Sequence, residues 1–206
     1  MLSVRAIVVD GPNAYVATDL PRGENLRAIA DRRFADARLT PTACAPSASN
    51  SRARSKDVHA AGLVHGDLKP SAVFVDGDRV VLADGGGTPS LWTAKHLGER
   101  TALIGTPYYA PIEQFGGEAP DAGSDVYNLA TLLFEMACGA QPWAGRSFLE
   151  VFQAKLAAEP PTIASRAPKA RVPRELEAVL RRGLHADAQR RYPSAAALRK
   201  ALEALD

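Results

Sequence analysis

The stretch His65–Ser71 constrains this chain most, because it places a carboxylate (Asp67) and an ammonium (Lys69) two residues apart, just ahead of a strand. Residues 73–83 read as a β-hairpin, since two apolar runs flank an Asp-Gly-Asp turn. Asp84 follows the hairpin, so we expect it to lie near the first two groups. One carboxylate can orient a hydroxyl, a second can hold Mg²⁺, and an ammonium can neutralise a moving phosphoryl group. The pattern therefore predicts phosphoryl-transfer chemistry.

Three further stretches follow in order: Gly105–Gln114, Ser124–Leu129 and Asp187–Tyr192. With His65 to Val75, they resemble motifs of the eukaryotic-type serine/threonine protein kinases: the catalytic loop, the end of the activation segment, the central helix and a stretch near the end of the large lobe. The resemblance implies an α+β, protein-kinase-like fold. It also implies one domain over residues 1–206, with residues 1–20 as a remnant small lobe and hinge and 21–206 as a mainly helical large lobe.

The resemblance also implies roles for four residues. Asp67 would be the catalytic carboxylate that orients or accepts the proton of the substrate hydroxyl. Lys69 would stabilise the transferring phosphoryl group, and Asp84 would bind Mg²⁺. Lys69 and Thr106, in Gly-Thr-Pro, match serine/threonine rather than tyrosine kinases. Solvated loop carboxylates are the alternative reading of Asp67 and Asp84.

The implied cofactors are ATP and Mg²⁺, both expected to bind weakly. Asp19, Leu20 and Pro21 would form the hinge that reads adenine, and Phe74 would form an apolar floor beneath it. Pro21 has no N–H, so adenine would lose one hydrogen bond, worth roughly 0.5–1.5 kcal/mol. A simple turn after an edge strand would explain the same hinge residues without any nucleotide.

Several positions depart from the family pattern. The arginine before the catalytic aspartate, which pairs with a phosphorylated activation loop, is Gly66, so we expect that switch to be missing. The asparagine that binds a second metal is Ala72, and a methyl group binds no metal. The phenylalanine of the metal-binding loop is Gly85. From Met1 onward nothing matches the family's glycine-rich loop, strand lysine or helix glutamate, and a true truncation and a start inside a longer reading frame are both open explanations.

Three residues are expected to be architectural. By resemblance, Asp125 accepts backbone N–H bonds from the catalytic loop, and Glu113 pairs with Arg191 to tie the activation segment to the end of the lobe. Hydrophobic periodicity and cap residues predict the other elements. We predict strands at 4–9 and 14–18, helices at 24–34, 123–139, 146–158, 173–184 and 194–205, and a proline-rich loop at 160–173. Residues 41–56 fit a poorly apolar helix and a loose loop equally well.

The composition limits which classes of binding partner and which cell compartment are expected. The net charge is only +2, so no nucleic acid or acidic membrane surface is expected. The chain has only two cysteines, Cys44 and Cys138, as expected in a reducing compartment. The one short N-terminal apolar run, Ala6 to Val9, ends at Asp10, which is typical of neither a signal peptide nor a membrane span. We therefore expect a cytoplasmic protein that acts on protein substrates or partners.

Three functions remain open. The first is a degraded or truncated serine/threonine kinase, a pseudokinase acting as a binding module. The second is an active kinase whose small lobe comes from an upstream segment or a partner. The third, a small-molecule phosphotransferase, suits His65-Gly66-Asp67 but not Lys69 or Gly105–Pro107. The predicted hairpin at residues 1–20 has free edges and uncovered apolar residues, so self-association through it is also expected.

Overall fold

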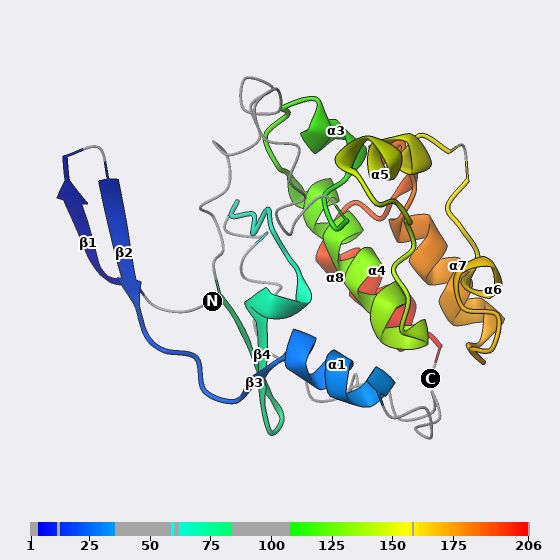
Figure 1. Cartoon of the computed structure of the whole chain (residues 1–206), viewed down its shortest axis with the longest axis horizontal. Helices are drawn as coiled ribbons and strands as arrows, with labels where there is room; N and C mark the ends of the chain where they lie inside the picture. Colours follow the sequence, from blue (N-terminus) through cyan, green and yellow to red (C-terminus); the bar gives the residue numbers. More distant parts are fainter. Residues whose placement is uncertain are drawn as a thin grey trace.

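The structure is a computed structural model. It describes residues 4–11, 13–35, 59, 62–83, 108–157 and 159–205. Helices gather around one central helix, and a small sheet lies beside them, with a separate β-hairpin standing out from this body (Figure 1). This is the α+β arrangement expected from the sequence.

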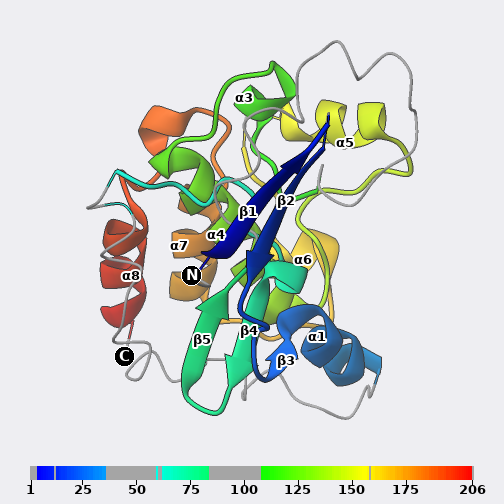
Figure 2. The same cartoon turned by 90° about the vertical axis from the view of Figure 1, so that its left-hand side faces the viewer.

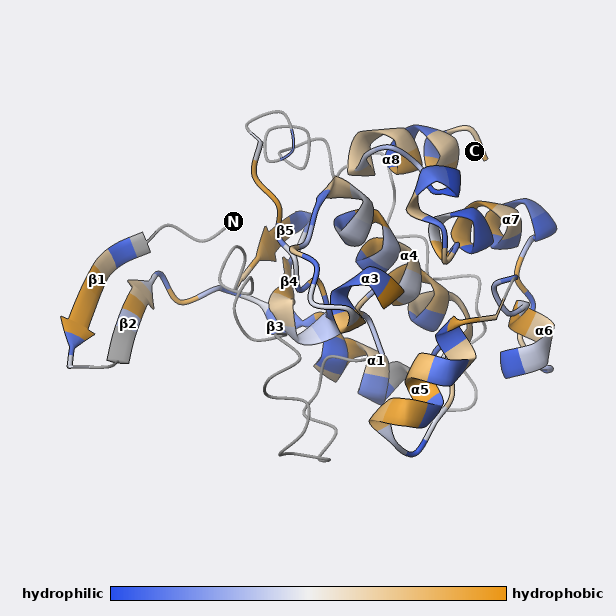
Figure 3. Ribbon diagram, turned by 90° about the horizontal axis from the view of Figure 1, so that it is seen from above, coloured by the Kyte–Doolittle hydropathy of each residue, from blue (hydrophilic) through white to orange (hydrophobic). Residues whose placement is uncertain are grey.

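Two sheets are present in the described residues. Strands β1 (Val4–Asp10) and β2 (Asn13–Thr18) pair with each other as an antiparallel hairpin. Strands β3 (Glu24–Asn25), β4 (Val73–Asp76) and β5 (Arg79–Leu82) form an antiparallel sheet in the order β3-β4-β5. Figure 2 shows this sheet beside helix α1, and Figure 3 shows the β1–β2 hairpin well clear of the helices.

The helices of the described chain are mostly short. The α-helices are α1 (Leu26–Ala35), α3 (Ile112–Phe115), α4 (Ala122–Cys138), α5 (Phe148–Lys155), α6 (Ile163–Arg166), α7 (Arg174–Gly183) and α8 (Ala195–Glu203), and the 3₁₀ turns are η2 (Pro70–Ala72) and η4 (Ala188–Arg190). No described helix is both long and apolar enough to span a membrane.

Helix α4 is the centre of the core. A capping box starts it, because the Asp121 side chain accepts from the Ser124 N–H and the Ser124 side chain accepts from the Asp121 N–H. Gly139 ends it in the left-handed conformation, with φ of 74°. Its buried face packs against α5 and α7 through a cluster of apolar side chains: Tyr127, Ala130, Phe134, Trp143, Val151, Ile163, Leu180 and Leu184. The predicted helix over 123–139 is confirmed almost to the residue.

Helix α7 can lie close to α4 because Gly183 has no side chain. A Cβ added there would come within 2.6 Å of the Ala130 Cβ. Ser194 caps α8 as predicted, since its side chain accepts from the Ala197 N–H. Two cap residues that can be read from the sequence, Gly139 and Ser194, thus set the end of α4 and the start of α8.

Some predicted elements differ from the structure. Glu24 and Asn25, expected as the first helical residues, are instead a short strand that pairs with Val75 and Phe74. Helix α5 is shorter than the predicted 146–158, and the loop expected over 160–173 contains the short helix α6. Pairing between strands and packing between helices decide these cases, and neither can be read from the hydrophobic periodicity of the sequence. Residues 41–56 lie outside the described part of the chain.

Candidate active site

The loop before η2 is held by one buried carboxylate on α4. Asp125 Oδ2 accepts from the His65 N–H at 2.9 Å, and Oδ1 accepts from the Gly66 N–H at 2.8 Å. The His59 Nε2 lies 2.8 Å from Oδ2 as well. A carboxylate that receives several N–H groups in a low-dielectric interior fixes a loop firmly. The contact expected between Asp125 and the loop backbone is therefore present, and His59 is an additional partner.

The His65 ring links this loop to the end of β5. Its Nδ1 accepts from the Asp67 N–H at 3.4 Å, so Nε2 carries the ring proton and donates to the Ala83 carbonyl at 2.8 Å. The backbone of Ala83 is bonded on its other side, because its N–H donates to the Ala72 carbonyl at 2.8 Å. The end of the hairpin, and so the residue just before Asp84, is fixed against the loop.

Asp67 and Lys69 form a largely buried ion pair. The Lys69 Nζ lies 2.5 Å from Asp67 Oδ2. Asp67 Oδ1 is buried and accepts no hydrogen bond from the described residues. A buried carboxylate oxygen with no donor is costly unless a ligand or water supplies one. This oxygen is suited to accept a hydroxyl proton, with the ammonium beside it to balance negative charge.

The backbone excludes an arginine at position 66. Gly66 has φ of +78°, a conformation that residues with a side chain rarely adopt. A Cβ there would lie 2.8 Å from the Pro120 Cγ. The chain around position 66 therefore leaves no room for the family's arginine, and Gly66→Arg alone would strain this loop.

At Ala72, where the family has its second metal ligand, only backbone atoms could bind a metal. Ala72 is fully buried, its N–H donates to the Lys69 carbonyl at 2.9 Å, and its own carbonyl is occupied by Ala83. No group of three metal-ligating side chains occurs among the described residues. Magnesium prefers several carboxylate or carbonyl oxygens and its own waters. Among the described residues, position 72 therefore offers a divalent cation no side-chain ligand, and no chemical step here is assigned to one.

The candidate hinge lies between β2 and β3. The Asp19 carboxylate pairs with the Arg5 guanidinium at 2.6 and 3.0 Å, so its side chain faces the β1–β2 hairpin. Leu20 is almost fully exposed, whereas Pro21 is half-buried. Phe74 is half-buried in β4, opposite Asn25 in β3. The β3–β4 pairing therefore carries the chain that follows Pro21 alongside the strand that contains Phe74.

Two expected site residues are not covered by the structure. Asp84, the metal-ligand candidate, and Thr106, the candidate of the Gly-Thr-Pro motif, lie outside the described residues. Of the three expected catalytic residues, the structure brings Asp67 and Lys69 together. Asp19 belongs to the expected hinge, where its backbone carbonyl would read adenine; its carboxylate pairs with Arg5 at the hairpin, and the hinge role stays a prediction.

A second polar cluster, which sequence reasoning missed, holds residues 108–110. The buried Lys155 Nζ lies 3.0 Å from the Tyr108 carbonyl and 2.6 Å from the Ala110 carbonyl. From α4, the Asn128 side-chain amide donates to the Tyr109 carbonyl at 2.8 Å. The only sequence signal was a lysine within the apolar stretch of α5. This backbone segment is therefore held in one shape from two helices.

The Tyr109 side chain reaches a charged pair that joins α1 to α4. Its hydroxyl donates to the Glu135 carboxylate, which also receives the Arg27 guanidinium at 2.9 Å. Burial and the nearby carboxylate raise the pKa of Tyr109, so the hydroxyl stays protonated and remains a donor. The end of this segment is thus tied to two helices far apart in sequence.

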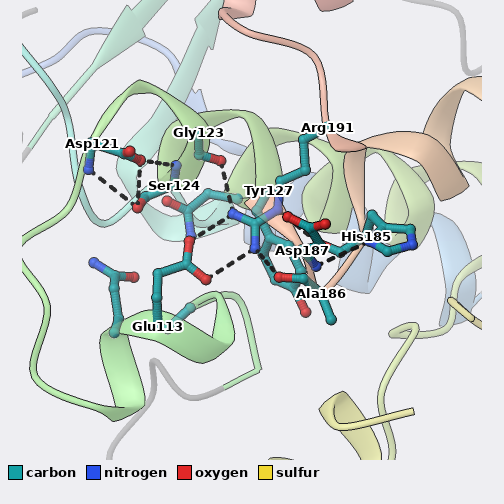
Figure 4. Close-up of polar contacts among 12 residues, drawn as sticks. Glu113, Asp121, Gly123, Ser124, Tyr127, His185, Ala186, Asp187 and Arg191 are labelled. Atoms are coloured by element: carbon teal, nitrogen blue, oxygen red, sulfur yellow. Dashed lines mark hydrogen bonds and ion pairs between the residues drawn. The ribbon is translucent and has the colours of Figure 1, made fainter. Parts of the chain in front are cut away.

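Glu113 and Arg191 form the predicted pair. Figure 4 shows the bidentate contact, with Arg191 Nη1 and Nη2 lying 2.6 and 2.9 Å from the two carboxylate oxygens. The same guanidinium donates to three carbonyls: Gly123, His185 and Ala186. All five of its N–H groups therefore have a role in joining α3, α4 and the chain before η4. Planar, bidentate geometry of this kind suits arginine and not lysine.

The buried Lys155 predicts a pH dependence of stability. Burial, and then the charge of Arg191, hold the pKa of Lys155 well below its ordinary value of 10.5. Between that lowered pKa and 10.5, the unfolded chain binds more protons than the native one, so the free energy of unfolding should rise with pH, by up to about 1.4 kcal/mol per pH unit. We expect Lys155→Met to remove this slope in urea unfolding, and Lys200→Met, on an exposed lysine, to keep it. Equal slopes in all three proteins would contradict the prediction.

Comparison with known proteins agrees with this geometry. A family model described as the protein kinase domain matches residues 4–202. The chain belongs to the protein kinase family, and its similarity to bacterial enzymes places it with the eukaryotic-type serine/threonine kinases of bacteria.

Two curated relatives illustrate that similarity. Serine/threonine-protein kinase PkaB of Streptomyces coelicolor is 38% identical over 154 residues, which cover 70% of this chain and 36% of that protein. Serine/threonine-protein kinase PknB of Mycolicibacterium smegmatis is 30% identical over 192 residues, covering 92% of this chain and 30% of that protein. The chain therefore spans about a third of the length of these relatives.

A solved structure supports the fold. The crystal structure of Rad53 1–466 in complex with AMP-PNP superposes with a TM-score of 0.68 at 18% identity. The match covers 98% of this chain and 50% of that one. At this identity the likeness establishes the kinase-like fold, as expected from the sequence.

Proposed function

We propose that this chain is a serine/threonine protein kinase-like domain with weak or no phosphoryl transfer of its own, acting as a protein-binding module. The observation that carries the proposal is Ala72. A fully buried methyl group, with both backbone groups already bonded, stands where the family has a metal-binding side chain. Without a second ligand, the charge of the transferring phosphate would be poorly neutralised.

The binding role is supported by how completely the rest of the lobe is built. Asp125 holds the catalytic loop, Lys155 holds residues 108–110, and Arg191 makes a fully bonded pair with Glu113. Such a scaffold presents a fixed surface, and rigid surfaces bind partners with a smaller loss of conformational entropy. We propose residues 21–206 as this large-lobe platform and 1–20 as a small-lobe remnant and hinge.

A second function rests on the Asp67–Lys69 pair. This pair and the unbonded Asp67 Oδ1 retain the polar groups that a phosphoryl transfer needs. An active kinase, completed by a small lobe from elsewhere, is therefore the alternative. A small-molecule phosphotransferase is disfavoured by Lys69 and by the Glu113–Arg191 pair, which match the protein-kinase pattern.

Nucleotide binding tests the proposal directly. We expect calorimetric titration with a non-hydrolysable ATP analogue to give weak binding that Mg²⁺ strengthens little. Ala72→Asn should increase the effect of Mg²⁺, whereas Ser71→Asn, which adds the same group at the exposed neighbour, should not. Thermal unfolding checks that both variants fold. Tight, Mg²⁺-dependent binding by the unchanged chain would refute the proposal.

The β1–β2 hairpin is the expected contact surface for self-association or for a partner that completes the sheet. Its apolar residues are strongly exposed, Ile7 by 66% and Val9 by 73%. Both strand edges are open within the described structure, where the hairpin forms a sheet of its own. Open edges and an uncovered apolar face favour pairing with another chain.

Deleting residues 1–20 should therefore leave the large lobe folded and less associated. Light scattering over a range of concentrations measures this, with the apparent mass of the full chain rising and that of the shortened chain staying constant. Ile7→Lys together with Val9→Lys should act like the deletion, while Arg22→Lys should not. A full chain that stays monomeric at high concentration without a partner would contradict the prediction.

A further inference from the structure

A basic hollow lies far along the chain from the Asp67–Lys69 pair, between the end of α7 and η4. Its volume is about 370 Å³, near the lower end of the roughly 300–1,000 Å³ typical of small-ligand sites. Three arginines and one histidine line it, with only one acidic residue: Arg181, Arg182, Arg190, His185 and Glu159, together with Pro160 and Ala178. The hollow therefore concentrates positive charge that its own walls do not balance.

His185 carries a buried donor that nothing in the described structure uses. The residue is only 8% exposed, and its Nδ1 accepts from the Asp187 N–H at 3.0 Å. The ring proton therefore resides on Nε2, which is buried and bonded to no described group. A buried N–H without an acceptor is unfavourable, and His185 is among the residues that line the hollow, so we expect a small movement of the ring to bring Nε2 to an acceptor bound there. Figure 4 shows this ring on the side turned away from the Glu113–Arg191 pair.

The arginines are fixed at different points around the hollow. Arg181 Nε donates to the Pro160 carbonyl at 3.0 Å, and the Arg182 guanidinium stacks on the Tyr192 ring at 4.3 Å from its centroid. These contacts hold the two stems and leave further N–H groups of each fork for an anion. Arg190, 59% exposed on its side chain, is the more adaptable third cation.

Glu159 is a weak internal counter-ion. Its oxygens lie 3.7 Å from Arg181 Nη2 and 3.8 Å from Arg190 Nη2, which are long for charged hydrogen bonds. The side chain is 65% exposed, so it can turn into solvent. Once Glu159 has turned away, Arg181 and Arg190 present two positive charges, which match a phosphoryl dianion better than a single carboxylate.

We propose that this hollow binds a phosphoryl group, with Arg181, Arg190 and the His185 Nε2 proton as its donors and Glu159 as the group it displaces. The site is separate from the candidate active site, so it can exist whether or not the chain transfers phosphate. A phosphorylated side chain of a protein partner and free inorganic phosphate share this chemistry. The test below distinguishes the two sources.

The experiment is a ¹⁵N NMR titration of the full chain that follows arginine Nε–H signals and backbone signals of residues 181–190. The probes are inorganic phosphate, N-acetyl-O-phosphoserine methylamide and its unphosphorylated serine counterpart. We expect saturable shifts with inorganic phosphate and with the phosphoserine probe, and none with the unphosphorylated serine counterpart. A preference for the phosphoserine probe identifies a protein side chain as the source, and the reverse preference identifies free phosphate.

Four variants test the assignment. Arg190→Ala and His185→Asn should each weaken binding about tenfold, since each removes one donor, and asparagine keeps an acceptor for the Asp187 N–H. Glu159→Gln should tighten binding, a gain that misfolding cannot produce. Arg174→Ala, at the other end of α7, should leave affinity unchanged. Absence of saturable shifts, or equal losses in Arg174→Ala and Arg190→Ala, would overturn the proposal.

Discussion

Incubated with radiolabelled ATP, a protein substrate and Mg²⁺ or Mn²⁺, the chain alone is expected to transfer phosphate below the detection limit. Kinases typically turn over at about 1–100 s⁻¹. Losing one group that stabilises charge in the transition state costs roughly 10²–10³ in rate. Ala72 removes one metal ligand, and Pro21 removes one adenine contact. Gly66 removes the arginine through which a phosphorylated activation loop would act. The combined loss is not additive but is expected to leave no measurable rate.

The controls distinguish a chain without phosphate-transfer activity from a kinase that is only slow. Asp67→Asn removes the candidate proton acceptor while keeping a similar shape, so any trace of phosphate transfer by contaminating kinases should survive it. Phosphate incorporation that Asp67→Asn abolishes would show that the prediction is wrong. The same assay with a supplied kinase small lobe tests the alternative function, in which activity should appear and should depend on Asp67 and Lys69.

Breaking the Glu113–Arg191 pair should lower the free energy of unfolding by about 3–5 kcal/mol, the largest single-residue effect expected on stability. Arg191→Met removes a fully buried guanidinium and leaves the Glu113 carboxylate and three carbonyls without their donor. Since small domains have only about 5–15 kcal/mol in total, much of the stability would be lost. Urea unfolding measures the effect.

Two further variants sharpen the test. Arg190→Met, at the exposed neighbour, should change stability by no more than about 0.5 kcal/mol. Glu113→Gln combined with Arg191→Met should cost less than the sum of the two single changes, because the pair acts as a unit. Equal effects of Arg190→Met and Arg191→Met would contradict the importance given to this pair.

The sequence by itself determined the features that depend on local pattern. Apolar spacing and the terminal Gly139 defined α4, because 3.6-residue periodicity and a left-handed cap are properties of a short segment. The hairpin after the catalytic loop followed from its Asp-Gly-Asp turn. The motif order, starting from His65 to Ser71, implied a kinase-like fold, and with it the Asp125 anchor and the Glu113–Arg191 pair.

Only the tertiary structure decided which groups meet across long stretches of chain. Arg27 and Glu135 pair although they are 108 residues apart, and no local pattern joins them. The Lys155 ammonium reaches carbonyls 47 and 45 residues away, contacts that the lysine's place in an amphipathic helix does not reveal. Pro120 excludes a side chain at Gly66, and His185 is left with an unused proton beside three arginines. Such contacts depend on how the helices pack, and packing places residues together whose sequence separation carries no signal of it.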